Sequence, residues 1–455
     1  MLSNRGAKSV GSQDIPWRFA PGGNNRYDKV TNPTGVISFG TAENGLVHEE
    51  LEYFVSKNVQ IPALAFSYRF STMGGPRFPG AMAAHMNEYF NPHSPVESEH
   101  IITASGLTAI HELVGRSLAD PGDGILVSRP IYGRFELDFG NTASLNIVYA
   151  DSDGMDPFSL DIVMQYQKAF NLSAAKGVHV KAILIVNPHN PSGRCYPAET
   201  LAALMQFCQH NSIHMISDEV YALSVYDTGC KEAHVFTSAL SIDPTGIIDP
   251  ERLHIFYGMS KDFASAGLRL GSLISRNALL REAVAANMRF HNPSGMSIAI
   301  ATAILEDRAF VRTFISLCRE RLAGSRAYTC RVLDEAGIKY APSGNAGFFL
   351  YVDLSPWLPA KTSEVGDSER EFYLAQKLLN GGVGVHPGEE HGEKAGHFRL
   401  VFSSFDRDTL AEGLRRLLRI LGPVSSVESA VSGAQTDGVE MNGTKANGVK
   451  INGFY

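Results

Sequence analysis

Residues 182–221 read AILIVNPHNPSGRCYPAETLAALMQFCQHNSIHMISDEVY. Two short apolar runs, Ala182–Val186 and His214–Ser217, flank a segment in which apolar residues recur at helical spacing between Leu201 and Cys208. A strand, a helix and a second strand in this order predict parallel pairing, because parallel neighbours need a crossover connection rather than a tight hairpin. These residues therefore indicate an α/β fold.

The same alternation continues on both sides of this unit. Five further strand-like runs lie at Ile101–Ala104, Ile125–Ser128, Asn146–Tyr149, Ile255–Tyr257 and Leu270–Ser275. Together the seven runs predict a large α/β domain with a mostly parallel, seven-stranded sheet. After residue 276 the pattern changes to longer helical stretches, with helices expected at Phe310–Glu335 and Thr409–Ile420 and a strand at Phe348–Val352. This later part predicts a second, smaller α+β domain.

We expect four parts along the chain. They are an N-terminal arm with part of the small domain at 1–60, the large domain at 61–300, the small domain at 301–423 and a disordered tail at 424–455. The tail is rich in Ser, Gly and Asn and repeats Asn-Gly at Asn442, Asn447 and Asn452. Such a segment has too few apolar residues to offset the entropy cost of ordering it.

The composition excludes several classes of protein. The chain has 455 residues, a net charge of -7 and 44% hydrophobic residues, which is typical of a globular protein. It has no Lys/Arg-rich run, so nucleic acid is not an expected partner, and no run of about 18 apolar residues that would predict a membrane span. The five cysteines form no C-x-x-C pair, no metal-site spacing occurs, and the N-terminus lacks the apolar run of a secretory signal. We therefore expect a cytoplasmic protein without a metal site.

Five polar clusters follow strand-like runs, where an open α/β sheet binds its ligands. They are Ser105-Gly106-Leu107-Thr108, Arg129-Pro130-Ile131-Tyr132, Asn187-Pro-His-Asn190-Pro-Ser-Gly193, Ser217-Asp218-Glu219-Val220-Tyr221, and Ser260-Lys261 with Arg269 further on. Singly, each has an ordinary interpretation: Ser105-Gly106 as a helix cap, Lys261 as a surface charge. Because all five follow strands, one shared site explains them more simply than five unrelated loops do.

The combination resembles the pyridoxal 5'-phosphate (PLP) enzymes of fold type I, in the class I/II aminotransferase family. Within that family it looks most like the 1-aminocyclopropane-1-carboxylate (ACC) synthase branch. The resemblance runs from about Tyr27 to Gly422 and rests on several segments in order. They are YDKVTNPTGVISFGTAENGL, ASGLTAIHEL, RPIYGRFELDF, NPHNPSG, SDEVY, SKDFASAGLRLG, NAGFFLYVDL and HFRLVFS. The resemblance implies a two-domain homodimer that acts on a small amino-acid substrate, with its sites at the subunit interface.

The family's roles carry over to matching residues of this chain. Lys261 would form the Schiff base with the cofactor and move the Cα proton of the substrate. Asp218 would pair with the pyridine nitrogen and keep it protonated, so that the ring accepts electrons released at Cα. Tyr221 and Asn190 would hydrogen-bond the ring's 3-oxygen, and Tyr132 would stack on the ring.

The resemblance also implies a phosphate site and a substrate carboxylate site. Phosphate would be held by the backbone of Gly106, Leu107 and Thr108 at a helix N-terminus, together with Ser260 and Arg269. Arg399, in HFRLVFS, would bind the substrate α-carboxylate. Glu43, in TAENGL, matches a glutamate typical of ACC synthases, although it can equally be a turn residue near a helix start.

Two positions depart from the family pattern. Gly258 stands where the family usually has a serine that binds phosphate, which predicts somewhat weaker cofactor binding. Thr72 stands where ACC synthases have a tyrosine that reaches into the neighbouring subunit's site, which puts true ACC synthesis in doubt.

These residues predict a PLP enzyme that removes the Cα proton of an amino acid or amino-acid conjugate. We favour elimination at Cβ or Cγ with a sulfur leaving group, because the ACC synthase branch includes such lyases. Aminotransfer to a 2-oxo acid is the close alternative. True ACC synthesis and a non-catalytic scaffold are weaker alternatives, the last because Lys261, Asp218, Tyr221, Arg269 and Arg399 are all present.

Overall fold

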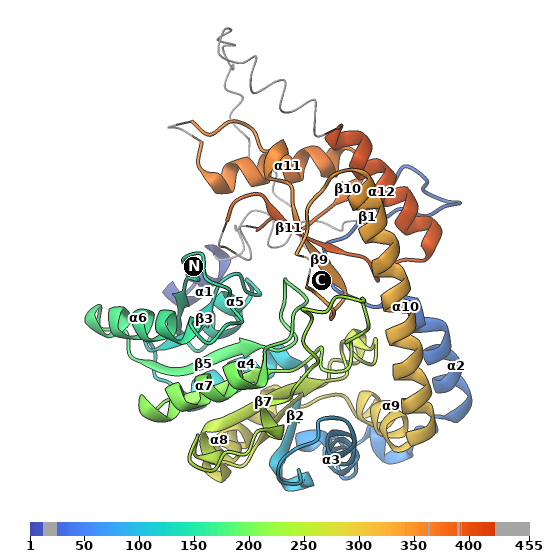
Figure 1. Ribbon diagram of the computed structural model, residues 1–455. Helices are drawn as coiled ribbons and strands as arrows, with labels where there is room; N and C mark the ends of the chain where they lie inside the picture. The colour runs from blue at the N-terminus through green and yellow to red at the C-terminus, as the bar shows by residue number, and fades with distance from the viewer. Residues whose placement is uncertain (12–24, 342, 363–364, 389–391, 393, 424–455) are drawn as a thin grey trace.

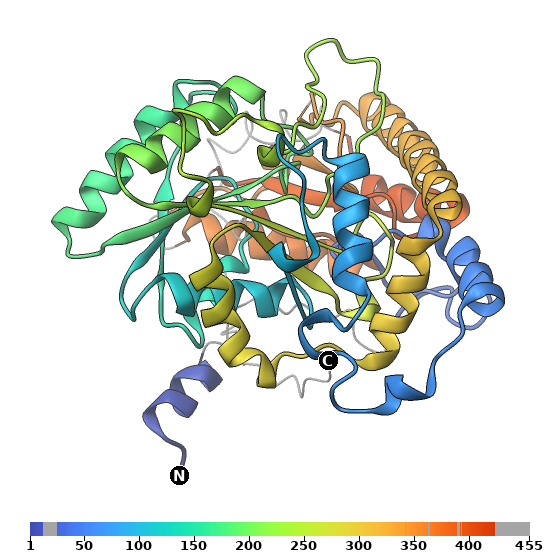
Figure 2. The same cartoon turned by 90° about the horizontal axis from the view of Figure 1, so that it is seen from below.

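The computed structural model describes residues 1–11, 25–341, 343–362, 365–388, 392 and 394–423. Near the beginning, Asn4–Gly11 form helix α1, which has no buried side chain. Figure 2 shows this helix extending away from the rest of the molecule. The tail predicted at 424–455 lies outside the described residues, and so does the segment 12–24.

A seven-stranded sheet forms the centre of the molecule (Figure 1). Its strands are β2 (Ile101–Ala104), β3 (Gly124–Ser128), β4 (Asn146–Ala150), β5 (Val180–Val186), β6 (His214–Asp218), β7 (Leu253–Gly258) and β8 (Gly271–Ser275). They lie in the order β2-β8-β7-β6-β5-β3-β4, and every adjacent pair is parallel except the two that include β8. The prediction of a mostly parallel sheet of seven strands is confirmed.

Strand β8 runs against its neighbours because of the short link that precedes it. Residues 259–270 join β7 to β8 and hold a single 3₁₀ turn, Ala266–Leu268. A link of this kind cannot cross the sheet as a helix does, so the chain turns back beside β7. Lys261 lies in this link.

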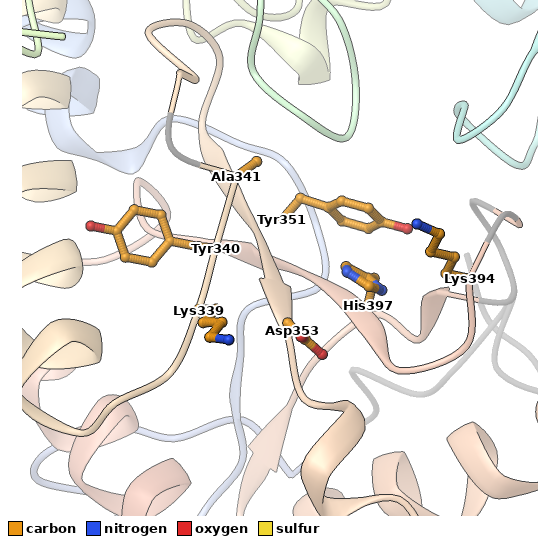
Figure 3. A pocket seen from close by; sticks show the side chains of 7 residues that line it. All are labelled: Lys339, Tyr340, Ala341, Tyr351, Asp353, Lys394 and His397. Carbon is orange, nitrogen blue, oxygen red and sulfur yellow. The ribbon is translucent and has the colours of Figure 1, made fainter. Parts of the chain in front are cut away.

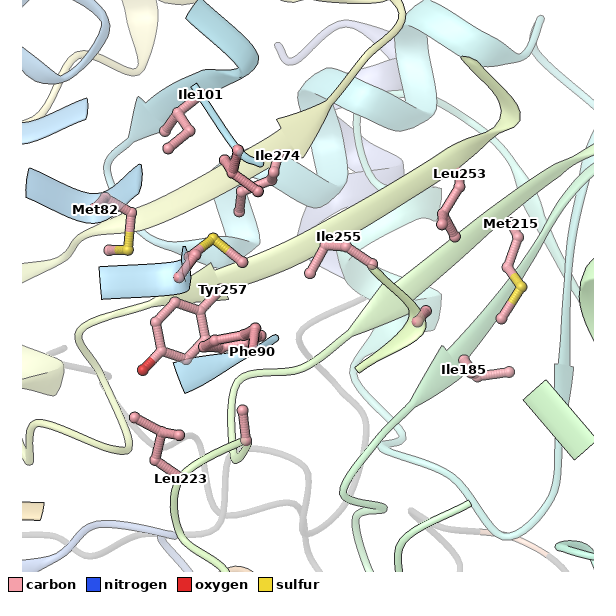
Figure 4. Packing of buried hydrophobic residues seen from close by; sticks show 14 of the residues in the cluster. Met82, Phe90, Ile101, Ile185, Met215, Leu223, Leu253, Ile255, Tyr257 and Ile274 are labelled. Atoms are coloured by element: carbon pink, nitrogen blue, oxygen red, sulfur yellow. The ribbon is translucent and has the colours of Figure 1, made fainter. Parts of the chain in front are cut away.

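Helices cover both faces of the sheet, because alternate strand residues point to opposite faces. In β5, Ala182, Leu184 and Val186 pack on one face and Ile183 and Ile185 on the other. The first face carries α4 (Leu107–Leu118), α5 (Phe135–Gly140) and α8 (Ala278–Asn287). The second carries α3 (Phe78–Tyr89), α6 (Ile162–Ala175), α7 (Ala198–His210) and α9 (Gly295–Glu306). Figure 4 shows part of this second layer, with Ile185 labelled on its strand.

A second group of elements packs around its own hydrophobic cluster, above the sheet in Figure 1. It contains the parallel pair β1 (Ile37–Ser38) and β10 (Val383–Gly384), the antiparallel pair β9 (Phe349–Asp353) and β11 (His397–Val401), and helices α11 (Asp367–Asn380) and α12 (Arg407–Leu421). The long helix α10 (Arg308–Glu335) runs beside both groups, and α2 (His48–Asn58) lies near its lower end. The pairing of β1 with β10 brings the beginning of the chain into this second group.

The described residues contain no helix that is both long and apolar enough to cross a membrane. In the same ranges, no cluster of His, Cys, Asp and Glu side chains is arranged to hold a metal ion. The limits predicted for the domains, at residues 60, 300 and 423, stay predictions.

Candidate active site

A cavity of about 410 Å³ lies at the carboxyl ends of the parallel strands, where α/β sheets bind ligands. One wall comes from the ends of β5 and β6 and from the link after β7, and the other from Gly40–Ala42, His386 and β11. The predicted site residues that line it are Leu107, Thr108, Tyr132, Asn190, Asp218, Tyr221, Ser260, Lys261, Arg269 and Arg399. Gly106 and Glu43 are not among the lining residues. The fold thus gathers side chains from all five polar clusters into one cavity.

A second depression, of about 300 Å³, lies on the β9–β11 pair (Figure 3). Lys339, Tyr351, Asp353 and Lys394 are among its lining residues. Figure 3 shows Tyr351 directed toward Lys394, while Tyr340 points to the opposite side. None of the predicted site residues lines this depression, so the cavity at the strand ends is the candidate active site.

Lys261 presents its amine inside the cavity. Its Nζ donates a hydrogen bond to the Ala42 carbonyl at 2.6 Å, which bridges the two walls. Burial, together with the nearby Arg399 cation, lowers the pKa of Lys261 to about 8. An amine with that pKa is neutral in roughly one molecule in ten at pH 7, against fewer than about one in a thousand for an ordinary lysine. This amine can therefore act as a nucleophile or as a base.

Asp218 is the last residue of β6 and is almost fully buried. Its Oδ1 accepts a hydrogen bond from the Val220 amide at 3.1 Å, and its Oδ2 lies 3.8 Å from His111 Nε2. The pairing of Asp218 with Val186 of β5 fixes the backbone at this point. The carboxylate is thus held at the floor of the cavity by two rigid strands.

Tyr221 follows Asp218 by three residues and is buried between two other aromatic rings. The rings of Phe348 and Phe349 meet it edge-on at centroid distances of 5.3 and 5.5 Å. Burial raises the pKa of Tyr221, so its phenol stays protonated and can donate a hydrogen bond. The Lys261 amine lies 5.8 Å from the centre of the Tyr221 ring.

Asp262 joins the Lys261 link to the loop that follows Tyr221. Its carboxylate accepts hydrogen bonds from the Leu223 amide at 2.9 Å, the Ser224 hydroxyl at 2.6 Å and the Tyr257 hydroxyl at 3.0 Å. Asp262 is buried, which raises its pKa to about 6. These three bonds fix the position of one loop relative to the other.

The start of α4 packs tightly against Arg269 and β8. Gly106 has φ +96°, and a Cβ there would lie 2.6 Å from Arg269 Nη2. A Cβ on Gly271 would lie 2.4 Å from the amide nitrogen of Leu107. Both positions thus require glycine, and the result is a helix N-terminus with a guanidinium beside it. This arrangement is a cradle for a phosphate group.

The departure at Gly258 also has a packing reason. A Cβ at Gly258 would lie 2.4 Å from the Leu270 carbonyl oxygen and 3.0 Å from the Cα of Gly271. The backbone of the returning strand β8 therefore fills the space in which a serine side chain would begin. In this chain the two strands approach each other more closely than a serine at position 258 would allow.

Arg399, on β11, faces Lys261 across the cavity and is buried. It donates hydrogen bonds to Asn190 Oδ1 at 3.0 Å and to the Gly40 carbonyl at 2.7 Å. Its Nε is buried and has no hydrogen-bond partner among the described residues. A guanidinium with a donor left over can bind a carboxylate.

Two other predicted residues lie at the edge of the site. Tyr132 is half-buried, lines the cavity and packs edge-on against Phe135 at 5.2 Å. Glu43 is exposed, and its carbonyl accepts a hydrogen bond from Ser403 at 2.6 Å. The Glu43 charge nevertheless acts on Lys261, whose pKa it raises slightly against the larger effects of burial and Arg399. Thr72 is exposed and does not line the cavity of its own chain.

Sequence reasoning missed several lining residues, among them His111, Arg134, Asp138 and His386. One signal was present, because His111 lies one helical turn after Leu107 on the apolar stripe that α4 buries. A histidine on such a stripe needs a polar partner. The partner, Asp138, could not be identified without the packing of α5 on α4.

The comparisons with known proteins bear on this geometry. The family model described as aminotransferase class I and II matches residues 67–417, well over half of the chain. The chain belongs to this family. The resemblance inferred from its motifs is confirmed, and the protein is a PLP-dependent enzyme.

Curated relatives of this family member fall into two groups by name. The human 1-aminocyclopropane-1-carboxylate synthase-like protein 1 is 30% identical over 411 residues, which cover 88% of this chain and 79% of that protein. An Arabidopsis thaliana protein, 1-aminocyclopropane-1-carboxylate synthase 7, is 31% identical and covers 86% of this chain and 88% of its own length. An Aspergillus oryzae protein named probable aminotransferase aclI is 31% identical over 92% of this chain and 98% of its own length.

Solved structures support the fold. Aspartate aminotransferase from Thermus thermophilus with maleate superimposes with a TM-score of 0.67 at 20% identity, over 92% of this chain and 97% of that one. An archaeal alanine:glyoxylate aminotransferase gives a TM-score of 0.68 at 22% identity, over 86% and 91% of the two chains. The fold is therefore that of fold type I aminotransferases.

PLP is the cofactor of this family, and the residues of the cavity fit it. The glycine-formed cradle at Gly106 suits its phosphate, and the buried carboxylate of Asp218 suits its ring nitrogen. The Lys261 amine suits its aldehyde. Asp218 and Lys261 line the 410 Å³ cavity, and so do Leu107, Thr108 and Arg269 of the cradle.

Proposed function

We propose that this enzyme is a lyase that expels a leaving group, with sulfur the favoured leaving atom, from Cβ or Cγ of an amino acid or amino-acid conjugate. The observation that carries its first step, removal of the Cα proton, is the Lys261 amine, enclosed beside Arg399 with its pKa lowered to about 8. Arg399 holds the substrate carboxylate, and the neutral amine takes the Cα proton. PLP, when bound, supplies the electron sink that makes this proton acidic.

The other residues of the cavity hold and orient the cofactor. Asp218 keeps a proton on the cofactor's ring nitrogen, and Asn190 and the protonated Tyr221 donate hydrogen bonds to its 3-oxygen. Tyr132 covers one face of the ring. The phosphate is bound by the backbone at Gly106, Leu107 and Thr108, with Ser260 and Arg269. These roles rest on the positions described above and on the family's chemistry.

Two observations favour elimination over amino-group transfer. The wall that Lys261 Nζ contacts is built from Gly40, Thr41 and Ala42, and these small residues leave room beside the substrate for a bulky leaving group. Several relatives are named for a product with a cyclopropane ring, and closing that ring from an amino acid requires a Cα carbanion and loss of a Cγ substituent. Glu43 matches the same branch.

Aminotransfer to a 2-oxo acid is the second candidate. It is favoured by the aclI protein, which is named as an aminotransferase and matches this chain over nearly its whole length. In aminotransfer, Lys261 would move the proton taken from Cα to the C4' carbon of the cofactor. In elimination, the leaving group departs instead. The cavity geometry is compatible with both outcomes.

A homodimer is part of this proposal, and an exposed apolar surface supports it. Leu64, Phe66, Tyr68 and Phe290 are exposed by 67, 75, 103 and 81%. Figure 2 shows the blue segment that holds the first three running along the rim of the molecule beside α9. Leu64, Phe66 and Tyr68 lie within five residues of one another in the sequence, and exposed apolar side chains this close together are typical of a surface that a second subunit covers. Thr72 lies a few residues after this segment, in the 3₁₀ turn Thr72–Gly74. A cytoplasmic location is also part of the proposal.

The test supplies purified, PLP-loaded enzyme with a cysteine conjugate and no added 2-oxo acid. A lyase breaks the Cα–H and C–S bonds, and the released enamine hydrolyses to pyruvate and ammonia alongside the free thiol. We expect continuous release of all three products, and none from the K261A variant. Turnover that requires an added 2-oxo acid and releases no ammonia would reject the lyase and support the aminotransferase.

A further inference from the structure

His111 lies beside Asp218, in a compartment between α4, α5 and the sheet, and both His111 and Asp138 also line the active-site cavity. His111 is 3% exposed, and its Nδ1 donates a hydrogen bond to Asp138 Oδ2 at 2.8 Å. Its Nε2 points at Asp218 Oδ2 from 3.8 Å, an ion-pair distance rather than a hydrogen bond. Both ring nitrogens thus face carboxylates, from two different elements.

The surroundings of the imidazole are otherwise apolar. Rings of Phe135, Phe139 and Phe256 lie 5.3, 5.4 and 5.4 Å from it. The charged groups that face it are Asp138 from α5 and Asp218 from β6, while β7 presents Phe256. On α4 itself the nearest carboxylate belongs to Glu112, which lies near Arg116 and His291 instead.

The charges in this compartment define the protonation state of the imidazole. Burial alone would favour the neutral ring, but the hydrogen bond to Asp138 and the charge of Asp218 outweigh it and raise the pKa of His111 to about 9. With His111 protonated, the two carboxylates and the imidazolium carry one net negative charge. A protonated ring nitrogen of the cofactor neutralises that charge.

We propose that His111 is a positioning residue for the cofactor. Asp138 holds the His111 imidazole in its protonated form, and this imidazolium fixes the orientation and charge of Asp218 toward the ring nitrogen. The chain Asp138–His111–Asp218 reaches from α5 to the cavity floor and connects helix packing to the electronic state of the cofactor. This inference rests on the proposed placement of Asp218 at the ring nitrogen.

The first experiment needs no cofactor. Apo-protein carrying ¹³C-labelled histidine is titrated by NMR, with H111N used to assign the His111 signal. We expect a midpoint near pH 9 for His111 in the parent, and a fall of about one unit or more in D138N, because the nearest anion is removed. A midpoint at or below the ordinary value of about 6.5 in the parent would overturn the proposal.

The second experiment reads the bound cofactor by its spectrum. H111N removes a buried positive charge close to the cofactor, so the pH at which the absorption band of the lysine-bound cofactor changes should rise by about one unit. F139L alters the same aromatic surroundings without changing charge and serves as the matched control, with no expected shift. Equal shifts in H111N and F139L would mean that His111 only fills space, and no shift in H111N would likewise reject the proposal.

A third measurement separates this proposal from the placement of Asp218. The ¹⁵N shift of labelled PLP reports the proton on its ring nitrogen, and D218N should change it strongly. If D218N changes it and H111N does not, the His111 proposal fails while the placement of Asp218 stands. If D218N leaves it unchanged, the placement itself is wrong. Should H111N not fold, H111Q takes its place in assigning the His111 signal, and the D138N titration then decides.

Discussion

Replacing Asp262 tests whether the loops of Lys261 and Tyr221 are held together as the structure shows. D262A leaves three buried donors, the Leu223 amide and the hydroxyls of Ser224 and Tyr257, without their acceptor. A buried donor that loses its partner costs about 1–3 kcal/mol, and some recovery by water gives an expected loss of about 3–5 kcal/mol in the free energy of unfolding. Urea unfolding of the apo-protein, followed by fluorescence, measures this loss.

The matched control is D262N, which has nearly the same shape. Its amide oxygen can still accept from Leu223 and Tyr257, and the Ser224 hydroxyl can rotate to accept from the amide nitrogen. We expect it to lose less than half as much stability as D262A. PLP affinity should fall in D262A and stay near normal in D262N, because only the first releases the loops. A loss below about 1 kcal/mol in D262A would refute this reasoning.

Four further predictions concern single residues. K261A should lose both turnover and the visible absorption band of the lysine-bound cofactor after dialysis, since Lys261 is the lysine that lines the cavity. D218N should still bind PLP but lose activity by about a hundredfold or more in kcat, because an amide does not hold a proton on the ring nitrogen. G106A should weaken PLP binding by about tenfold to a hundredfold in a fluorescence titration, because its Cβ would press on Arg269 at a φ of +96°. Burial raises the pKa of Glu219 to about 7, although its hydrogen bonds act to lower it. The contribution of Glu219 to the free energy of unfolding is therefore complete below pH 4.5 and is lost as the pH rises through 7. E219Q should remove this pH dependence from urea titrations.

The strands could be predicted from the sequence because a strand buried on both faces is a continuous apolar run. The run Ile101–Ala104 coincides with β2, and Ala182–Val186 lies within the longer β5. The antiparallel course of β8 was not predicted, since its apolar residues look the same in either direction. The direction of β8 is set by the link after β7, which has no α-helix. In the sequence, the absence of a helix is harder to recognise than an apolar strand.

The predicted site residues gather in one cavity for a related reason. Each residue of the five polar clusters lies within a few residues of a strand end, and parallel strands end at the same edge of a sheet. Glu43 differs, because its position depends on how the beginning of the chain packs against Ser403, just after β11, and its side chain is exposed rather than in the cavity wall. Arg399 was identified through the resemblance and not from spacing, because its strand belongs to the second group of elements.

The choice between elimination and transfer depends on the part of the site that the sequence encodes least directly. In the proposed function, proton removal at Cα needs Lys261, Asp218 and the phosphate cradle, all of which lie at strand ends of one sheet. The fate of the resulting carbanion depends on the space beside the substrate, and the wall there joins Gly40–Ala42 to Arg399 across more than three hundred residues of chain. The two walls meet through the bond from Lys261 to the Ala42 carbonyl, which a bound substrate must displace or pass. Enlarging a side chain in this wall, as in A42V, should therefore reduce kcat/KM for a bulky conjugate more than for a small amino acid, and equal effects on both would show that the leaving group lies elsewhere.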